Sequence, residues 1–243
     1  MKFRTLGNPQ NPVILCIHAM FISDEMFDTI GALLEDNYYV VLPILSGHDI
    51  TEQTTFISVA DEAEKIIQYL QQEHIEDIEI LLGTSLGGII AFEIFRRNTL
   101  KISKIFLDGT PFIQLSQFNI KFKAMLFKKI AHKSSKYPDK PNILDKLYPA
   151  HSTKMKKICG NMSDESIDNL AKACYTYKLP PKIILSQKQN LTFLYGTKEK
   201  AKICIPTIRK YKNCKLIIKD GYTHCGFLGK EPKRYVDMLL ANN

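Results

Sequence analysis

The sequence has no long hydrophobic run, which argues against a helix that spans a membrane. Its longest apolar runs, such as Ile78–Leu82 with Glu79 inside it, are far shorter than the roughly 18 apolar residues that a bilayer-spanning helix requires. The first residues, Met1 to Asn8, contain no apolar segment of the kind found in secretory signals. We therefore predict a cytoplasmic protein without stable insertion into a membrane.

Closely paired cysteines are also absent. The six cysteines lie far apart and form no Cys-x-x-Cys motif, whereas structural zinc sites usually draw ligands from much tighter pairs. We predict no metal site and no cofactor, and we interpret the cysteines as small buried apolar residues in a reducing compartment. With 45% apolar and 24% charged residues, the 243-residue chain has the composition of a globular protein that can bury a sizeable core.

Short apolar runs alternate with amphipathic stretches along the chain. Six runs predict strands: Val13–Ile17, Tyr39–Leu42, Ile78–Leu82, Lys104–Leu107, Leu191–Tyr195 and Lys215–Ile218. Their mostly continuous apolar character is typical of strands covered on both faces. Between them lie helical patterns, the clearest of which begins at Ser58 as an N-cap. This alternation predicts an α/β fold, with a doubly wound, mostly parallel sheet between helices.

One segment interrupts the alternation. From about Phe112 to Pro181 no convincing strand occurs, and helical patterns appear instead, one of them beginning at Ser163. Loops of this length are uncommon in compact domains. We therefore predict that residues 1–111 and 182–243 form the α/β core, and that residues 112–181 form a helical lid inserted into it.

The sharpest functional signal lies in residues 80–91, which read ILLGTSLGGIIA. An apolar strand runs into Gly-x-Ser-x-Gly and then directly into an apolar helix. Glycines two residues on either side of Ser85 allow a sharp, strained turn that exposes the hydroxyl at the positive end of the helix. This arrangement predicts that Ser85 is a nucleophile.

A serine nucleophile needs a base and an acid that orients the base. His224 follows the last predicted strand, at the same end of the sheet as Ser85, and is the predicted base. Glu199 follows the strand 191–195 and a glycine turn, and is the predicted acid; Asp108, which ends the strand 104–107, is the alternative acid. The remaining candidates in polar segments are expected to be solvated: His74, His132 and His151.

The order Ser85, Glu199, His224 resembles that of the α/β-hydrolase superfamily, whose triad runs Ser, Asp/Glu, His along the chain. The resemblance covers essentially the whole chain and is weakest in residues 112–181. It implies that the N–H groups of Met20 and Leu86 form an oxyanion hole.

Three positions depart from the pattern of that family. Ala19 and Asp49 stand where glycine is usual, and Glu199 stands where aspartate is usual. Either carboxylate can accept a hydrogen bond from an imidazole N–H, so the triad remains chemically complete. The resemblance also implies that His18, just before Ala19, is structural and neither acid nor base.

The positive charge is concentrated in the insertion. Residues 121–157 contain eleven lysines and two acids, while the whole chain has a formal net charge of +8. A lid helix with an apolar underside and a solvated lysine face explains this pattern. The functional alternatives are an anionic substrate, an acidic partner such as an acyl-carrier protein, or transient contact with an anionic membrane. Lysine without arginine, and without a recognition motif, argues against nucleic-acid binding.

Together these features predict a serine hydrolase that cleaves a small-molecule ester or thioester through an acyl-enzyme. Two alternatives remain open. One is a lyase or carbon–carbon bond hydrolase on the same scaffold; the other is a binding protein without catalysis. The presence of Ser85, Glu199 and His224 together argues against the second alternative.

Overall fold

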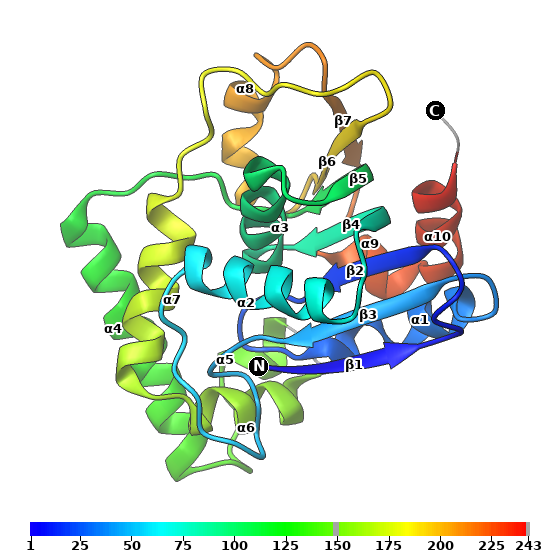
Figure 1. The fold of residues 1–243 in the computed structure, drawn as a ribbon. Helices are drawn as coiled ribbons and strands as arrows, with labels where there is room; N and C mark the ends of the chain where they lie inside the picture. Colours follow the sequence, from blue (N-terminus) through cyan, green and yellow to red (C-terminus); the bar gives the residue numbers. More distant parts are fainter. Residues whose placement is uncertain (148–150, 242–243) are drawn as a thin grey trace.

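A computed structural model of the chain describes residues 1–147 and 151–241 (Figure 1). Its centre is a seven-stranded sheet in the order β1-β3-β2-β4-β5-β6-β7, in which only β1 runs antiparallel to its neighbour. The strands are β1 (Lys2–Leu6), β2 (Val13–Ile17), β3 (Tyr39–Ile44), β4 (Asp77–Thr84), β5 (Lys101–Asp108), β6 (Asn190–Gly196) and β7 (Lys215–Lys219). The predicted α/β class is therefore confirmed.

All six predicted strands are present, several of them longer by a few residues, and β1 was missed. This strand lies at the edge of the sheet and is only partly buried, so its sequence lacks the continuous apolar run that marks the central strands. The predicted caps are present: the hydroxyls of Ser58 and Ser163 each accept a backbone N–H at 3.1 Å, from Asp61 and Ser166.

Helices cover both faces of the sheet. The α-helices are α1 (Asp28–Leu34), α2 (Val59–Gln72), α3 (Leu86–Arg97), α4 (Gln117–Lys136), α5 (Ile143–Leu147), α6 (Ser152–Asn161), α7 (Asp164–Thr176), α8 (Ile205–Ile208), α9 (Gly226–Lys230) and α10 (Pro232–Leu240). Along β2, Leu15 and Ile17 pack toward α2 and α3, while Ile14 and Cys16 pack toward α1 and α10. Both faces of the central strands are thus buried.

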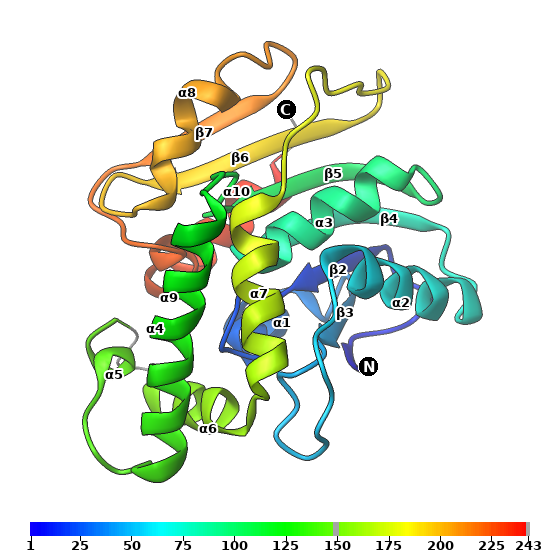
Figure 2. The same ribbon diagram turned by 90° about the vertical axis from the view of Figure 1, so that its left-hand side faces the viewer.

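The chain leaves the sheet after β5 and returns to it at β6, and α4 to α7 lie between. These inserted helices lie on the side to which the parallel strands point (Figure 1). Helices α4 and α7 run side by side, with α6 against α4 (Figure 2).

Both ends of the inserted segment are held in one aromatic cluster. Phe112 lies 5.7 Å from Phe92 of α3 and 6.0 Å from Phe193 of β6, between ring centroids. Tyr177 lies 6.3 Å from Phe112, and its hydroxyl donates a hydrogen bond of 2.8 Å to Glu93 of α3. The insertion is therefore anchored where it leaves the core and where it returns.

Two further observations concern membrane-spanning helices and the cysteines. No helix within the described ranges is long and apolar enough to cross a membrane. All six cysteines lie within those ranges and are free thiols; four are buried, and Cys214 and Cys225 are partly exposed.

Candidate active site

Ser85 lies in the turn between β4 and α3 with a strained backbone, at φ 51° and ψ −113°. Its N–H donates a hydrogen bond of 2.8 Å to the carbonyl of Asp108. The flanking glycines are required by close contacts: a Cβ on Gly83 would lie 2.4 Å from the Gly87 carbonyl, and one on Gly87 would lie 2.1 Å from the Ile17 carbonyl. The turn is thus fixed by contacts with β2 and β5.

The two N–H groups predicted to bind an oxyanion lie next to this turn. Leu86 is the first residue of α3, so its N–H has no acceptor within the helix and stands at the positive end of the helix dipole. Met20 lies on the loop after β2, and β2 runs parallel beside β4. Neither N–H donates a hydrogen bond to another group in the described part of the chain.

Two buried histidines hold the loop that carries Met20. The N–H of Phe21, a residue with φ 66°, donates to Nε2 of His48 at 3.1 Å. The N–H of Leu45 donates to Nε2 of His18, also at 3.1 Å. Because each Nε2 is an acceptor, each ring carries its proton on Nδ1 and donates to a backbone carbonyl, that of Ala19 or Ser46.

Both histidine rings are neutral. Burial lowers the pKa of His18 to about 4, and burial, with the repulsion that two protonated rings would exert on each other, lowers the pKa of His48 to about 3. Neither ring has a free nitrogen for proton transfer, which agrees with the structural role that the resemblance implies for His18. The contribution of His48 was missed, although its place in the turn of residues 43–49 was visible in the sequence.

His224 and Glu199 form a hydrogen-bonded pair. Nδ1–H of His224 donates to Oε2 of Glu199 at 2.7 Å, and Oε1 of Glu199 accepts the N–H of Gly196 at 2.5 Å. The Glu199 side chain is fully buried, whereas 28% of the His224 side chain is exposed. With its proton on Nδ1, the imidazole keeps the Nε2 lone pair for a proton.

Gly109 lies directly against this pair with φ +61°. A Cβ at this position would lie 2.8 Å from the ring of His224 and 3.0 Å from Oε2 of Glu199. The preceding residue, Asp108, binds the N–H of Ser85 through its carbonyl. Two consecutive residues at the end of β5 thus contact Ser85, His224 and Glu199 at the carboxyl edge of the sheet. Gly109 was missed in the sequence analysis, although its place directly after a strand-ending carboxylate was an available signal.

Asp108, the alternative acid, points elsewhere. Its Oδ2 accepts a hydrogen bond of 3.0 Å from the hydroxyl of Tyr235 on α10, and within the described residues it makes none with His224. Burial and the neighbouring charge of Glu199 raise the pKa of Asp108 to about 7. Of the two carboxylates considered in the sequence, Glu199 is the one that contacts the imidazole.

The remaining candidates are peripheral. His132 is exposed and lies 2.8 Å from Asp164, and His74 and His151 are exposed as expected. Within residues 1–147 and 151–241, no cluster of three or more histidine, cysteine or acidic side chains could hold a metal ion. Helix α4 reaches the Met20 loop through Phe127, whose ring meets Phe21 edge-on at 5.5 Å between centroids.

Comparison with known proteins gives consistent matches. Residues 12–197 match the family described as alpha/beta hydrolase fold. Human serine hydrolase-like protein 2 is 21% identical over 231 residues, which are 88% of this chain and 69% of that protein.

Solved structures match over almost the whole chain. An alpha/beta hydrolase family protein from Desulfitobacterium hafniense superimposes with a TM-score of 0.78 at 19% identity, over 98% of both chains. An esterase from Exiguobacterium antarcticum superimposes with a TM-score of 0.74 at 16% identity, over 98% of this chain and 93% of that one. At these identities the likeness shows the fold.

Proposed function

Because the chain belongs to the α/β-hydrolase family, we propose that it is a serine hydrolase that cleaves an ester or thioester through an acyl-enzyme. The observation that carries the proposal is the pair of His224 and Glu199, 2.7 Å apart, gathered with Ser85 around Asp108 and Gly109. The esterase from Exiguobacterium antarcticum, which shares the fold, supports ester chemistry by analogy.

The proposed reaction has two stages. In the first, Oγ of Ser85 attacks the carbonyl carbon while Nε2 of His224 takes the hydroxyl proton, and Glu199 stabilises the imidazolium. The oxyanion accepts hydrogen bonds from the N–H groups of Met20 and Leu86. The tetrahedral intermediate expels the alcohol or thiol, which receives the proton from His224. In the second stage water attacks the acyl-enzyme, His224 acts again as base, and the acid product leaves Ser85 free.

The inserted helices complete the proposal, since residues 112–181 would form a lid over the site. The eleven lysines of residues 121–157 favour an ester that is itself anionic or is presented by an anionic carrier, of which an acidic acyl-carrier protein is one. A cytoplasmic location belongs to the same proposal, since the partly exposed thiols of Cys214 and Cys225 stay free in a reducing compartment.

A serine-directed phosphonate tests the mechanism. We expect one adduct, which mass spectrometry locates on Ser85, and loss of activity against water-soluble esters of graded chain length. Ser85→Ala should lower kcat by at least about 10⁴-fold, whereas Ser186→Ala, an exposed serine far along the chain, serves as the matched control.

Two results would contradict the proposal. A folded Ser85→Ala protein that still turns over esters would remove Ser85 from the mechanism. A protein that reacts with the phosphonate at Ser85 but, before labelling, cleaves no ester or thioester and instead cleaves a carbon–carbon bond or acts as a lyase would favour the alternative chemistry on the same scaffold.

A further inference from the structure

Helix α4 has two apolar faces, where the sequence suggested one apolar underside. The inner face is covered: Ile120, Ala124 and Ala131 are buried, and Phe127 packs on Phe21. Four other apolar side chains of the same helix are exposed: Phe118 by 78%, Phe122 by 48%, Met125 by 55% and Leu126 by 36%. The prediction of a single apolar underside is therefore wrong for these four residues.

The exposed residues form one row along the helix. Phe118, Phe122 and Met125 advance by four and three residues, which places them on successive turns of one side, and Leu126 lies beside Met125. At 100° per residue, the row is centred about 180° from the buried face of α4. The same side continues toward the end of the helix with Lys129, Lys133 and Lys136. This outer face of α4 (residues 118, 122, 125, 126, 129, 133 and 136) begins apolar and ends basic.

The charge of α4 has one sign, because the helix contains six lysines and no acidic residue. Acids of α7 pair with one of these lysines: Asp168 lies 2.7 Å from Lys128 and Asp164 lies 3.8 Å from it. Within the described residues, Lys121 and Lys129 form no ion pair.

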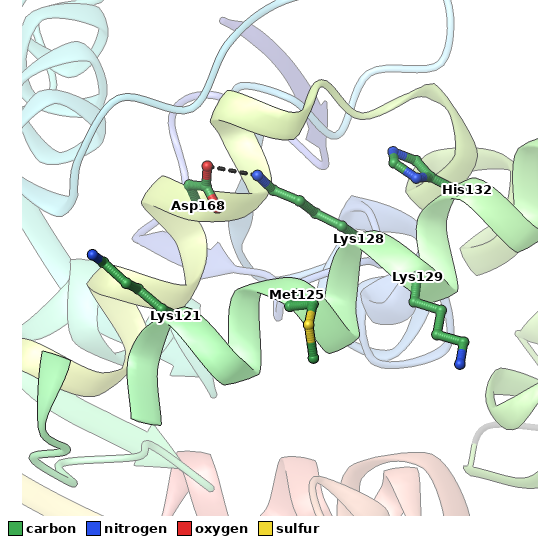
Figure 3. Close-up of a pocket in the computed structure, with 6 residues that line it drawn as sticks. All are labelled: Lys121, Met125, Lys128, Lys129, His132 and Asp168. Atoms are coloured by element: carbon green, nitrogen blue, oxygen red, sulfur yellow. Dashed lines mark hydrogen bonds and ion pairs between the residues drawn. The ribbon is translucent and has the colours of Figure 1, made fainter. Parts of the chain in front are cut away.

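Figure 3 shows this arrangement around a surface hollow of about 530 Å³ lined by Lys121, Met125, Lys128, Lys129, His132 and Asp168. Lys128 points toward Asp168, whereas Met125 and Lys129 point away from α7. Of the two unpaired lysines, Lys129 therefore shares one side of the helix with the exposed apolar side chains, whereas Lys121 points toward α7.

Charge and shape together identify the occupant. A second copy of the chain would bring lysines against lysines. An acidic protein would neutralise the lysines, but it would need an apolar groove shaped to a convex row of four side chains. A lipid surface deforms around such a row, takes aromatic and aliphatic side chains at the acyl boundary, and meets lysines with anionic headgroups. We propose that the outer face of α4 docks reversibly on an anionic lipid surface.

Docking in this orientation would have a direct consequence for the site. The inner face of α4 covers the loop of Phe21 and Met20, so the lipid surface would lie about one helix diameter, roughly 10 Å, from that loop. The proposal goes beyond the hydrolysis proposed above, because binding does not require Ser85 and can be measured in the Ser85→Ala protein.

Cosedimentation with vesicles tests the proposal. We expect the chain to bind mixed phosphatidylcholine and phosphatidylglycerol vesicles, and to bind phosphatidylcholine vesicles weakly. Phe118→Ser with Phe122→Ser should weaken binding by at least about tenfold, because two exposed rings no longer enter the acyl boundary. Lys129→Gln with Lys136→Gln should weaken it by about fivefold per lysine and reduce its salt dependence.

Matched controls separate docking from folding and catalysis. Ile184 and Ile203 are exposed by 86% and 70% on other surfaces, so Ile184→Ser with Ile203→Ser should leave vesicle binding unchanged. All three double variants should hydrolyse a neutral, water-soluble short-chain ester like the parent protein, which shows that their folds are intact.

Three outcomes would overturn the proposal. The first is no binding of the parent protein to anionic vesicles, and the second is equal binding by the phenylalanine variant and the isoleucine control. The third is binding of poly-L-glutamate through Lys129 and Lys136 without vesicle binding, which would assign the face to an acidic protein.

Discussion

The edge of the sheet around Ser85 and the outer face of α4 are built in opposite ways. At the sheet edge, the side chains that would do chemistry are held by fixed partners, as Glu199 is by His224 and Gly196. On the outer face of α4, four large apolar side chains are exposed, and Lys129 forms no ion pair within the described residues. The first region meets the geometric demands of a reaction; the second is suited to contacts that vary in shape. Substitutions should therefore affect turnover in the first region and binding in the second.

After the loss of Ser85 itself, the largest expected effect follows removal of the Glu199 charge. Glu199→Gln should lower kcat for a water-soluble ester by about 10³–10⁴-fold, because the amide favours the wrong imidazole tautomer and cannot stabilise the imidazolium. Asp108→Asn, which keeps an acceptor for Tyr235, should lower kcat by less than about tenfold. Urea unfolding at one pH serves as the control for folding. If Asp108→Asn has the larger kinetic effect, the acid follows β5 and Glu199 is not the acid.

A smaller effect concerns how the free energy of unfolding depends on pH through Asp108, at the same edge of the sheet. The pKa of Asp108 is raised from 3.8 to about 7, so between these values the folded chain keeps a proton that the unfolded chain loses. The free energy of unfolding should therefore decrease as the pH rises from about 4 to about 7, by an amount on the order of a few kcal/mol. Asp108→Asn should lack this decrease.

Urea unfolding of both proteins at about pH 5 and about pH 8 measures this difference. The stability of the parent relative to the variant should be higher at the acidic pH. Parallel dependence on pH in the two proteins would show that Asp108 does not titrate in this range when folded.

The smallest expected effect concerns the lysines of α4. Lysines steer an anionic substrate over roughly 8 Å at physiological salt, so kcat/KM for an anionic ester should fall severalfold as salt rises. A neutral short-chain ester should respond little. Replacing Lys121, Lys123 and Lys129 with Gln should remove the difference; Lys128 is left in place because it pairs with Asp168. Equal salt dependence for both esters would show that these lysines are only a solvated surface.

Much of the fold could be predicted from the sequence, because strands buried on both faces require continuous apolar runs. Residues 13–17 are a strand with the predicted bounds, and β1 escaped prediction because an edge strand needs no such run. Ser85 could be predicted from its flanking glycines, because the strained turn leaves little room for any other residue at those positions. Its role, with those of Glu199 and His224, stays a prediction.

Other features depend on tertiary contacts that a single sequence does not reveal. His48 was visible, but its hydrogen bond to the Phe21 N–H joins residues 27 positions apart. Gly109 matters because His224 and Glu199, which follow β7 and β6 far along the chain, lie against it. For α4, periodicity indicated which residues share a side of the helix, but not whether another element covers that side.

The aromatic cluster at Phe112 and Tyr177 has an evolutionary consequence. It holds the two ends of a long excursion from the sheet close together, with Phe92 and Phe193 between them and the core. Once the ends of a loop are fixed, doubling its length adds only about 0.6 kcal/mol of closure entropy. Helices could therefore be gained, lost or exchanged between these two anchor points while the neighbouring strands keep their register. The sequence and length of this segment can therefore change without altering the sheet. We expect the sequences of relatives to differ most between the positions of Phe112 and Tyr177.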